Sequence, residues 1–276
     1  MSEHTKRTNA HHLEFIHTSK AQEAGHTLSI TSKGKAYSYC HNSKTCDNEL
    51  GQLGRTGNTS IPLPVILPED GVPRYAYTGG FPSSGHSAIL DSTGHLWVSG
   101  CDRWQQLGLG SSDGGSTGYT WKGGRLWQTQ FQKNLYVIDF LKRLDPSLYA
   151  RDCVDAPKKW IRDVALGGDH TLILSHNKRD VIAFGKGGEG QLGLSSKPWV
   201  SSPSKSKVLS SSNADVAAVC AYRNCSFTLD DCGRVKDTAG KCSFEVKGLQ
   251  RAVDLCRKRA RADGMISNES LQSSDE

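Results

Sequence analysis

Short runs of strand-forming residues recur along the chain, separated by polar and glycine-containing stretches. Four first strands rich in β-branched and aliphatic side chains are predicted, at Thr27–Ile30, Ser87–Leu90, Thr171–Leu174 and Ser226–Leu229. Second strands follow at Ala36–Tyr39, Leu96–Ser99 and Val181–Phe184. Turn-forming residues separate the two strands of each pair, at Gly34, Gly94 and Gly233, and at Asn177 and Asp180 in the third pair. The pattern predicts a series of β-hairpins.

The hairpins belong to a longer internal repeat. Three segments carry it, at Gly25–Gly54, Gly85–Gly110 and Val164–Leu194, and each contains a Q-L-G motif near its end. From the repeat histidine to the small residue that closes the second strand there are 14, 14 and 15 residues. Agreement of both composition and spacing in three segments indicates a true repeat.

Two further copies are weaker. A degenerate fourth copy begins near Val219, with Cys225 at the histidine position, and a fifth is expected to start at Leu249 and Val253. A lone hairpin is only marginally stable in water, so several must share a core. Radial stacking of such units gives a propeller. The predicted fold is therefore an all-β propeller.

The G-x-x-H-T-L, aromatic-x-x-G and G-Q-L-G signatures resemble the repeats of the regulator of chromosome condensation family over residues 21–242. The resemblance implies a β-propeller of the chromosome-condensation-regulator type, which has seven blades in complete members. About four to five blades are recognisable here. Three arrangements are compatible with that number: a smaller closed ring, an incomplete ring that forms an open arc, or a ring whose divergent blades lie in the insertion and the termini.

The expected organisation has three parts. Residues 1–20 form an N-terminal tail or a first strand, and residues 21–256 form the propeller-repeat domain, which carries an insertion at 111–159. Residues 257–276 form a basic, then acidic, disordered tail.

Composition narrows the class of protein. The 276 residues include 29 glycines, which fits many tight turns, and carry a net charge of +6 without a dense basic stripe, so direct nucleic-acid binding is not expected. No apolar run reaches membrane-spanning length, and no secretory signal begins the chain. The nine cysteines are interpreted as reduced thiols in a cytoplasmic or nuclear protein.

The repeat positions are interpreted as structural. His26, His86 and His170 each take the same place in their own blade, so they do not converge as a zinc site requires. Glycines of the Q-L-G motifs serve turns, at Gly54, Gly108 and Gly193. Neither a metal nor a cofactor is expected, and no nucleophile–base pair is recognisable. The sequence therefore predicts a protein that is not an enzyme.

Candidate partner-binding residues lie in the loops. The insertion carries Trp and basic side chains of the types enriched in binding hot spots, at Trp121, Lys122, Arg125 and Trp127. An equally weighted alternative is that Leu126–Phe131 is a further strand with Trp127 in the core. In the family's exchange factor, acidic residues just before the repeat histidine grip the partner, and the resemblance assigns that role to Asp169 alone.

The C-terminal region offers a nuclear-import candidate, and the whole chain supports three hypotheses on function. The import candidate is a basic cluster, Arg257, Lys258, Arg259 and Arg261. The leading hypothesis on function is a non-catalytic scaffold that holds a protein partner on a propeller. The alternatives are a guanine-nucleotide exchange factor for a small Ras-like GTPase, and a substrate-recruiting fragment of a ubiquitin-ligase-type protein.

Overall fold

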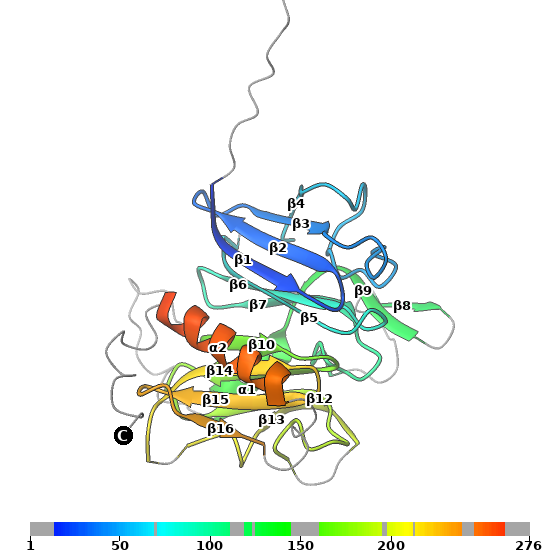
Figure 1. The fold of residues 1–276 in the computed structure, drawn as a ribbon. Coiled ribbons are helices and arrows are strands. Elements are labelled where there is room, and N and C mark those ends of the chain that lie inside the picture. Colours follow the sequence, from blue (N-terminus) through cyan, green and yellow to red (C-terminus); the bar gives the residue numbers. More distant parts are fainter. Residues whose placement is uncertain are drawn as a thin grey trace, which may run out of the picture.

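The structure is a computed structural model that describes residues 14–68, 71–110, 119–122, 125–144, 160–194, 198–211, 213–238 and 246–262. Within these ranges the chain folds into four antiparallel sheets and two helices (Figure 1). Each sheet contains one copy of the sequence repeat and is one blade of a propeller. The predicted propeller and its four better-defined repeats are confirmed.

The strands of each blade lie side by side in sequence order, except that β9 lies between β7 and β8 in blade 2. Blade 1 consists of β1 (Phe15–Ala21), β2 (His26–Thr31), β3 (Ala36–Cys40) and β4 (Leu63–Val65). Blade 2 has the order β5 (Pro73–Gly79), β6 (His86–Asp91), β7 (Leu96–Cys101), β9 (Arg125–Lys133) and β8 (Tyr119–Lys122). Blade 3 consists of β10 (Ile161–Leu166), β11 (His170–Ser175), β12 (Val181–Lys186) and β13 (Trp199–Lys205). Blade 4 has three strands, β14 (Val216–Tyr222), β15 (Cys225–Asp230) and β16 (Val235–Asp237).

Buried side chains join consecutive blades in three joints. Leu28 and Ile30 of blade 1 pack with Ile89 and Trp97 of blade 2. A second cluster joins blades 2 and 3, and a third joins blades 3 and 4. Because successive residues of a strand face opposite sides, each middle strand supplies apolar side chains to the joints on both sides. Stacking of neighbouring sheets therefore makes the core.

The two helices pack on the blades. Helix α1 (Leu135–Leu144) follows β9 and buries Val137 and Leu141 in the cluster between blades 2 and 3. Asn134 caps its first turn, since its side-chain oxygen accepts a hydrogen bond from the amide of Val137 at 2.9 Å. Helix α2 (Val246–Ala262) packs against β14 of blade 4, as Figure 1 shows in red and orange.

Three expectations are corrected by these elements. The fifth repeat copy expected at Leu249 and Val253 is instead part of helix α2, which also includes the first residues of the expected disordered tail, 257–262. The expected insertion at 111–159 contains β9, the strand that pairs with β7. Leu126–Phe131 is thus a strand, as one of the two alternatives proposed.

Two local features also differ from the predictions. In the third hairpin turn, the residue with positive φ is Lys178 (φ 59°), at the place that glycine takes in the other repeats. The interpretation of all cysteines as reduced thiols is wrong for four of them, because Cys40–Cys46 and Cys220–Cys256 are disulfide-bonded. Their Cα atoms lie 5.5 Å and 6.2 Å apart, within the usual range for disulfides.

Candidate partner-binding face

The repeat histidines join neighbouring blades. His26 Nε2 lies 2.9 Å from Ser87 Oγ in blade 2, and that hydroxyl donates a hydrogen bond of 2.7 Å to the Gln52 carbonyl of blade 1. His170 Nε2 similarly lies 2.7 Å from Ser226 Oγ in blade 4. These side chains are buried, so each bond crosses a joint out of contact with water. The interpretation of the histidines as structural residues agrees with this arrangement.

Burial lowers the pKa of each repeat histidine. Desolvation of the charged form is the main cause, and it lowers the pKa of His26 and His170 to about 3 and that of His86 to about 4. Charge repulsion between the histidines adds to the effect at His26 and His170. All three rings are therefore neutral near pH 7, and the Nε2 atoms of His26 and His170 serve the bonds across the joints.

The repeat glycines sit where a side chain would collide with the next blade. Gly108 has a φ of +64°, and a Cβ atom there would lie 2.7 Å from the ring of Phe184 in blade 3. Gly54 has a φ of +62°, and its Cβ would lie 2.3 Å from Phe131 of blade 2. Gly193 has a similar φ of +59°. Both the backbone conformation and the close approach thus favour glycine.

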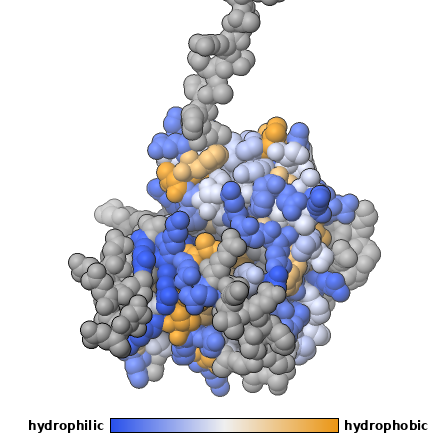
Figure 2. Space-filling view, viewed as in Figure 1, coloured by the Kyte–Doolittle hydropathy of each residue, from blue (hydrophilic) through white to orange (hydrophobic). Residues whose placement is uncertain are grey.

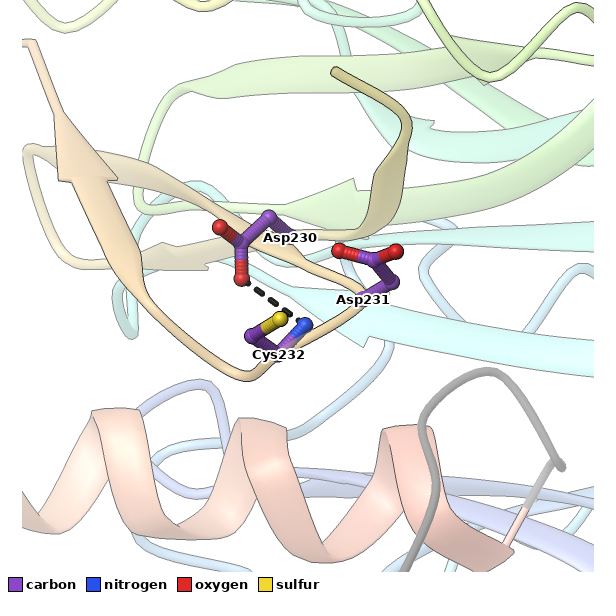
Figure 3. A group of neighbouring side chains, drawn as sticks. All are labelled: Asp230, Asp231 and Cys232. Carbon is purple, nitrogen blue, oxygen red and sulfur yellow. Dashed lines mark hydrogen bonds between the residues drawn. The ribbon is translucent and has the colours of Figure 1, made fainter. Parts of the chain in front are cut away.

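A group of acidic and sulfur side chains at one turn has a structural explanation. Asp230, Asp231 and Cys232 lie together where β15 ends (Figure 3). The Asp230 carboxylate accepts hydrogen bonds from the amides of Cys232 and Arg234, at 3.0 Å and 2.8 Å. It also accepts a bond of 2.6 Å from Arg234 Nε. Asp91 closes the equivalent turn of blade 2 in the same way, so the group belongs to the hairpin turn.

The inner strands enclose a hollow of about 720 Å³. Its walls are β1, β5, β10 and β14 with the turns that follow them, and helix α2 adds Leu255, Cys256 and Arg259. Two backbone hydrogen bonds link these turns, from the Gly80 amide to the Gly167 carbonyl and from the Gly168 amide to the Arg223 carbonyl. In the space-filling view, hydrophobic residues show between hydrophilic ones near α2 (Figure 2).

Charged and aromatic side chains interlock around the end of the blades where these turns lie. Glu189 accepts hydrogen bonds of 2.9 Å from both Lys186 and Asn224, which joins blades 3 and 4. The Lys186 ammonium also lies over the Trp104 ring of blade 2, 5.7 Å from its centroid. These four residues are half-buried. An ion pair of 2.5 Å between Arg223 and Glu23 connects blade 4 with blade 1. We call this set the loop face: Glu23, Trp104, Lys186, Glu189, Arg223 and Asn224.

The chain is similar in sequence to curated RCC2 proteins. It is 29% identical to the Danio rerio RCC2 homolog over 273 residues, which covers 94% of this chain and 50% of the relative. It is 27% identical to Homo sapiens RCC2 over 270 residues, covering 94% of this chain and 48% of the relative. The chain thus spans about half the length of these relatives. No family model matches the chain.

Two solved structures share the fold. Yeast RCC1 (Prp20), solved with Kap60, has a TM-score of 0.58 at 17% identity, covering 91% of this chain and 45% of that one. Human WBSCR16 has a TM-score of 0.55 at 20% identity, and the match covers 81% of this chain and 48% of that one. The fold is a chromosome-condensation-regulator propeller. Both similar structures and RCC2 relatives are about twice as long as this propeller segment.

The propeller places the predicted contact residue Asp169 in the turn between β10 and β11, but not on the surface. Asp169 is only 6% exposed. Burial lowers the pKa of His86, and the charge of Asp169 partly offsets that shift; burial raises the pKa of Cys101, and the same charge adds to it. The expectation that Asp169 grips a partner stays a prediction, and the burial of this side chain argues against it. Sequence inspection had missed the residues of the loop face that surround this turn.

The predicted aromatic and basic sites differ in how far the structure describes them. Trp121, Lys122, Arg125 and Trp127 belong to the backbone hairpin β8–β9, and their side chains lie outside the described part of the chain.

In the basic cluster, Arg257 donates hydrogen bonds to the Gly233 carbonyl and Arg259 pairs with Asp163, while Lys258 is exposed and Arg261 is half-buried. Neither of the described helices is long and apolar enough to cross a membrane.

Proposed function

We propose that this chain is a non-catalytic scaffold that binds a protein partner on the loop face. The observation that carries the proposal is the division of polar groups between the joints and this face. The repeat histidines are buried and neutral, and His26 and His170 bond across joints. Lys186, Glu189 and Arg223, by contrast, are partly exposed on turns anchored by strands.

The chemistry of the loop face suits a polar protein partner. Trp104 and Arg223 are residue types enriched in binding hot spots. The loop face carries both positive and negative side chains. It therefore complements a partner surface that also carries both acidic and basic groups. The side chains already hold one another in place, which lowers the entropy lost when a partner orders them.

Affinity purification with matched variants tests the proposal. Lys186→Glu places a repulsive charge beside Glu189, and Lys33→Glu makes the same change in the exposed β2–β3 turn at the opposite end of the strands. We expect specific partners to be lost with Lys186→Glu and retained with Lys33→Glu. Each partner would then be bound to the purified chain. Interactions that all survive Lys186→Glu would overturn the assignment to the loop face.

A second candidate function is guanine-nucleotide exchange on a small Ras-like GTPase. Its support is a similar structure, Saccharomyces cerevisiae Prp20p, which was studied for binding to Gsp1p and histones and has a TM-score of 0.54 at 17% identity. Nucleotide release would be measured over a panel of small GTPases. Acceleration that disappears in Arg223→Glu favours exchange, whereas unchanged release from every GTPase favours the scaffold alone.

A further inference from the structure

Helix α2 occupies the side of blade 4 that faces away from blade 3. Phe227 and Leu229 of β15 are buried there with Val253 and Ala260 of the helix. In blade 3 the equivalent positions of β11 are Leu172 and Leu174, which pack in the joint with blade 4. The helix therefore covers the surface on which a further blade would otherwise stack.

Two cysteines face each other across this contact. Cys220 is on β14 and Cys256 is on α2, and both belong to the same buried cluster. Their Cα atoms are 6.2 Å apart and their sulfur atoms are bonded to each other. They are 36 residues apart in the sequence, so the bond ties together elements that no short turn connects.

The remaining anchors of α2 are polar and lie in the same half of the helix. Arg257 donates two hydrogen bonds, of 3.1 Å and 3.0 Å, to the Gly233 carbonyl of the β15–β16 turn. Arg259 pairs with the fully buried Asp163 of blade 3 and bonds the Val219 carbonyl at 2.7 Å. The cysteine bond adds a covalent link at the centre of this contact.

We propose that Cys220 and Cys256 are a thiol–disulfide exchange site that latches α2 onto blade 4. Oxidation by a low-molecular-weight disulfide, such as glutathione disulfide, takes two electrons and two protons from the pair and releases two glutathione thiols. The protein gains one S–S bond. Reduction by two thiols reverses the step, and the helix is then held only by its noncovalent contacts.

The latch has a physical consequence for the opening of the helix. A disulfide across a loop of this length disfavours the open ensemble, because the helix cannot move far from the blade. In the reduced chain α2 can detach by local unfolding, which exposes Phe227 and Leu229 without unfolding the other blades. The state of one bond thereby controls access to an apolar sheet face.

Hydrogen exchange on the whole chain tests the latch. The protein would be equilibrated with glutathione disulfide or with a phosphine reductant, and the bond located by peptide mass mapping without reduction. We expect a Cys220–Cys256 peptide only in the oxidised sample. Reduction should raise amide exchange in 246–262 by at least about tenfold and leave β11 and β12 unchanged.

Serine variants separate the latch from general effects of oxidation. Cys256→Ser should show the fast exchange of α2 under both conditions. Cys40→Ser removes the other disulfide, and Cys232→Ser removes an exposed cysteine outside both bonds, so both should keep the redox response of α2. Failure of the folded chain to form the Cys220–Cys256 bond, or equal exchange of α2 in both states, would overturn the proposal.

Discussion

Blades meet in two different ways in this molecule. At the internal joints, one sheet stacks on another, and in two of them a buried histidine, His26 or His170, bonds to a hydroxyl group of the next blade. On the far side of blade 4, a helix replaces the sheet, and an arginine–aspartate pair and a disulfide take the place of the histidine bond. The repeat histidine is absent here, since Cys225 stands at its position. The histidine that serves a joint is thus absent from the blade whose outer side packs against a helix.

The outer side of the first blade also differs from the joints. Its outward side carries Ser29 at the place where the next two blades have Ile89 and Ile173 in their joints. Thr27 of blade 1 is equivalent to Ser87 and Ser226, whose hydroxyl groups bond the histidine of the preceding blade. The Thr27 hydroxyl instead bonds Nδ1 of His41 in its own blade, at 2.8 Å. Buried hydroxyl residues on the outer side of blade 1 and a helix on the outer side of blade 4 thus stand where the joints have apolar contacts between sheets.

The largest expected effect is at the helix. Arg259→Ala removes the partner of Asp163, whose side chain is fully buried, and leaves a charge without compensation. We expect a loss of about 3 kcal/mol or more in the free energy of unfolding. Urea denaturation measures it, with Lys258→Ala on the exposed side of α2 as the control, expected within about 0.5 kcal/mol. A small loss in Arg259→Ala would mean that α2 is a minor part of the fold.

Truncation of equivalent leucines sharpens the contrast between the two kinds of packing. Leu172 lies in the joint between blades 3 and 4, and Leu229 lies beneath α2, and both side chains are fully buried. Either substitution by alanine should cost about 2–5 kcal/mol. We expect Leu229→Ala to cost less, because a helix end can move into the cavity more readily than a sheet. Thermal unfolding of the two variants under oxidising conditions measures the difference, and a larger loss for Leu229→Ala contradicts it.

The sequence predicted the parts of this fold that are encoded locally. Each hairpin has its own strand residues and turn residues within about a dozen positions, so Thr27–Ile30 and Ala36–Tyr39 could be paired without knowledge of the remaining chain. The interpretation of the repeat histidines as structural has the same basis, since their positions recur with the hairpins. What they bond could not be predicted, because Ser87 and Ser226 come from the next blade.

The helices and the contacts between distant segments were missed. Val253, Cys256 and Ala260 have the spacing of one helix face, and this signal was available in the sequence but was interpreted as a further repeat. The pairing of Arg259 with Asp163 joins residues 96 positions apart, and no local pattern marks it. Asp169 shows the limit of inference by position, since the turn was predicted correctly while the burial of its side chain depends on neighbouring blades.

The internal joints should weaken in acid. Because burial lowers the pKa of the repeat histidines to about 3 or 4, the folded chain binds fewer protons than the unfolded chain below pH 6.5. Their contribution is complete above pH 6.5 and is lost as the pH falls from there toward the folded values. Each histidine should contribute a slope of about 1.4 kcal/mol per pH unit between pH 6 and pH 4.5.

Urea denaturation across this pH range measures the slope. His170→Asn should lower the slope by about the contribution of one histidine. An unchanged slope in His170→Asn would mean that this ring is protonated in the folded chain.

The smallest effect is expected for a hydroxyl group on the outer side of blade 1, compared with the equivalent hydroxyl group in an internal joint. Ser87→Ala leaves the His26 ring nitrogen and the Gln52 carbonyl without their shared partner inside a joint, which should cost about 1–3 kcal/mol. Thr27→Val removes the equivalent hydroxyl of blade 1, but its partner His41 is exposed and can bond water instead, so we expect a loss below about 0.5 kcal/mol. Equal losses in urea denaturation would show that the Thr27 hydroxyl contributes as much to stability as the Ser87 hydroxyl inside a joint.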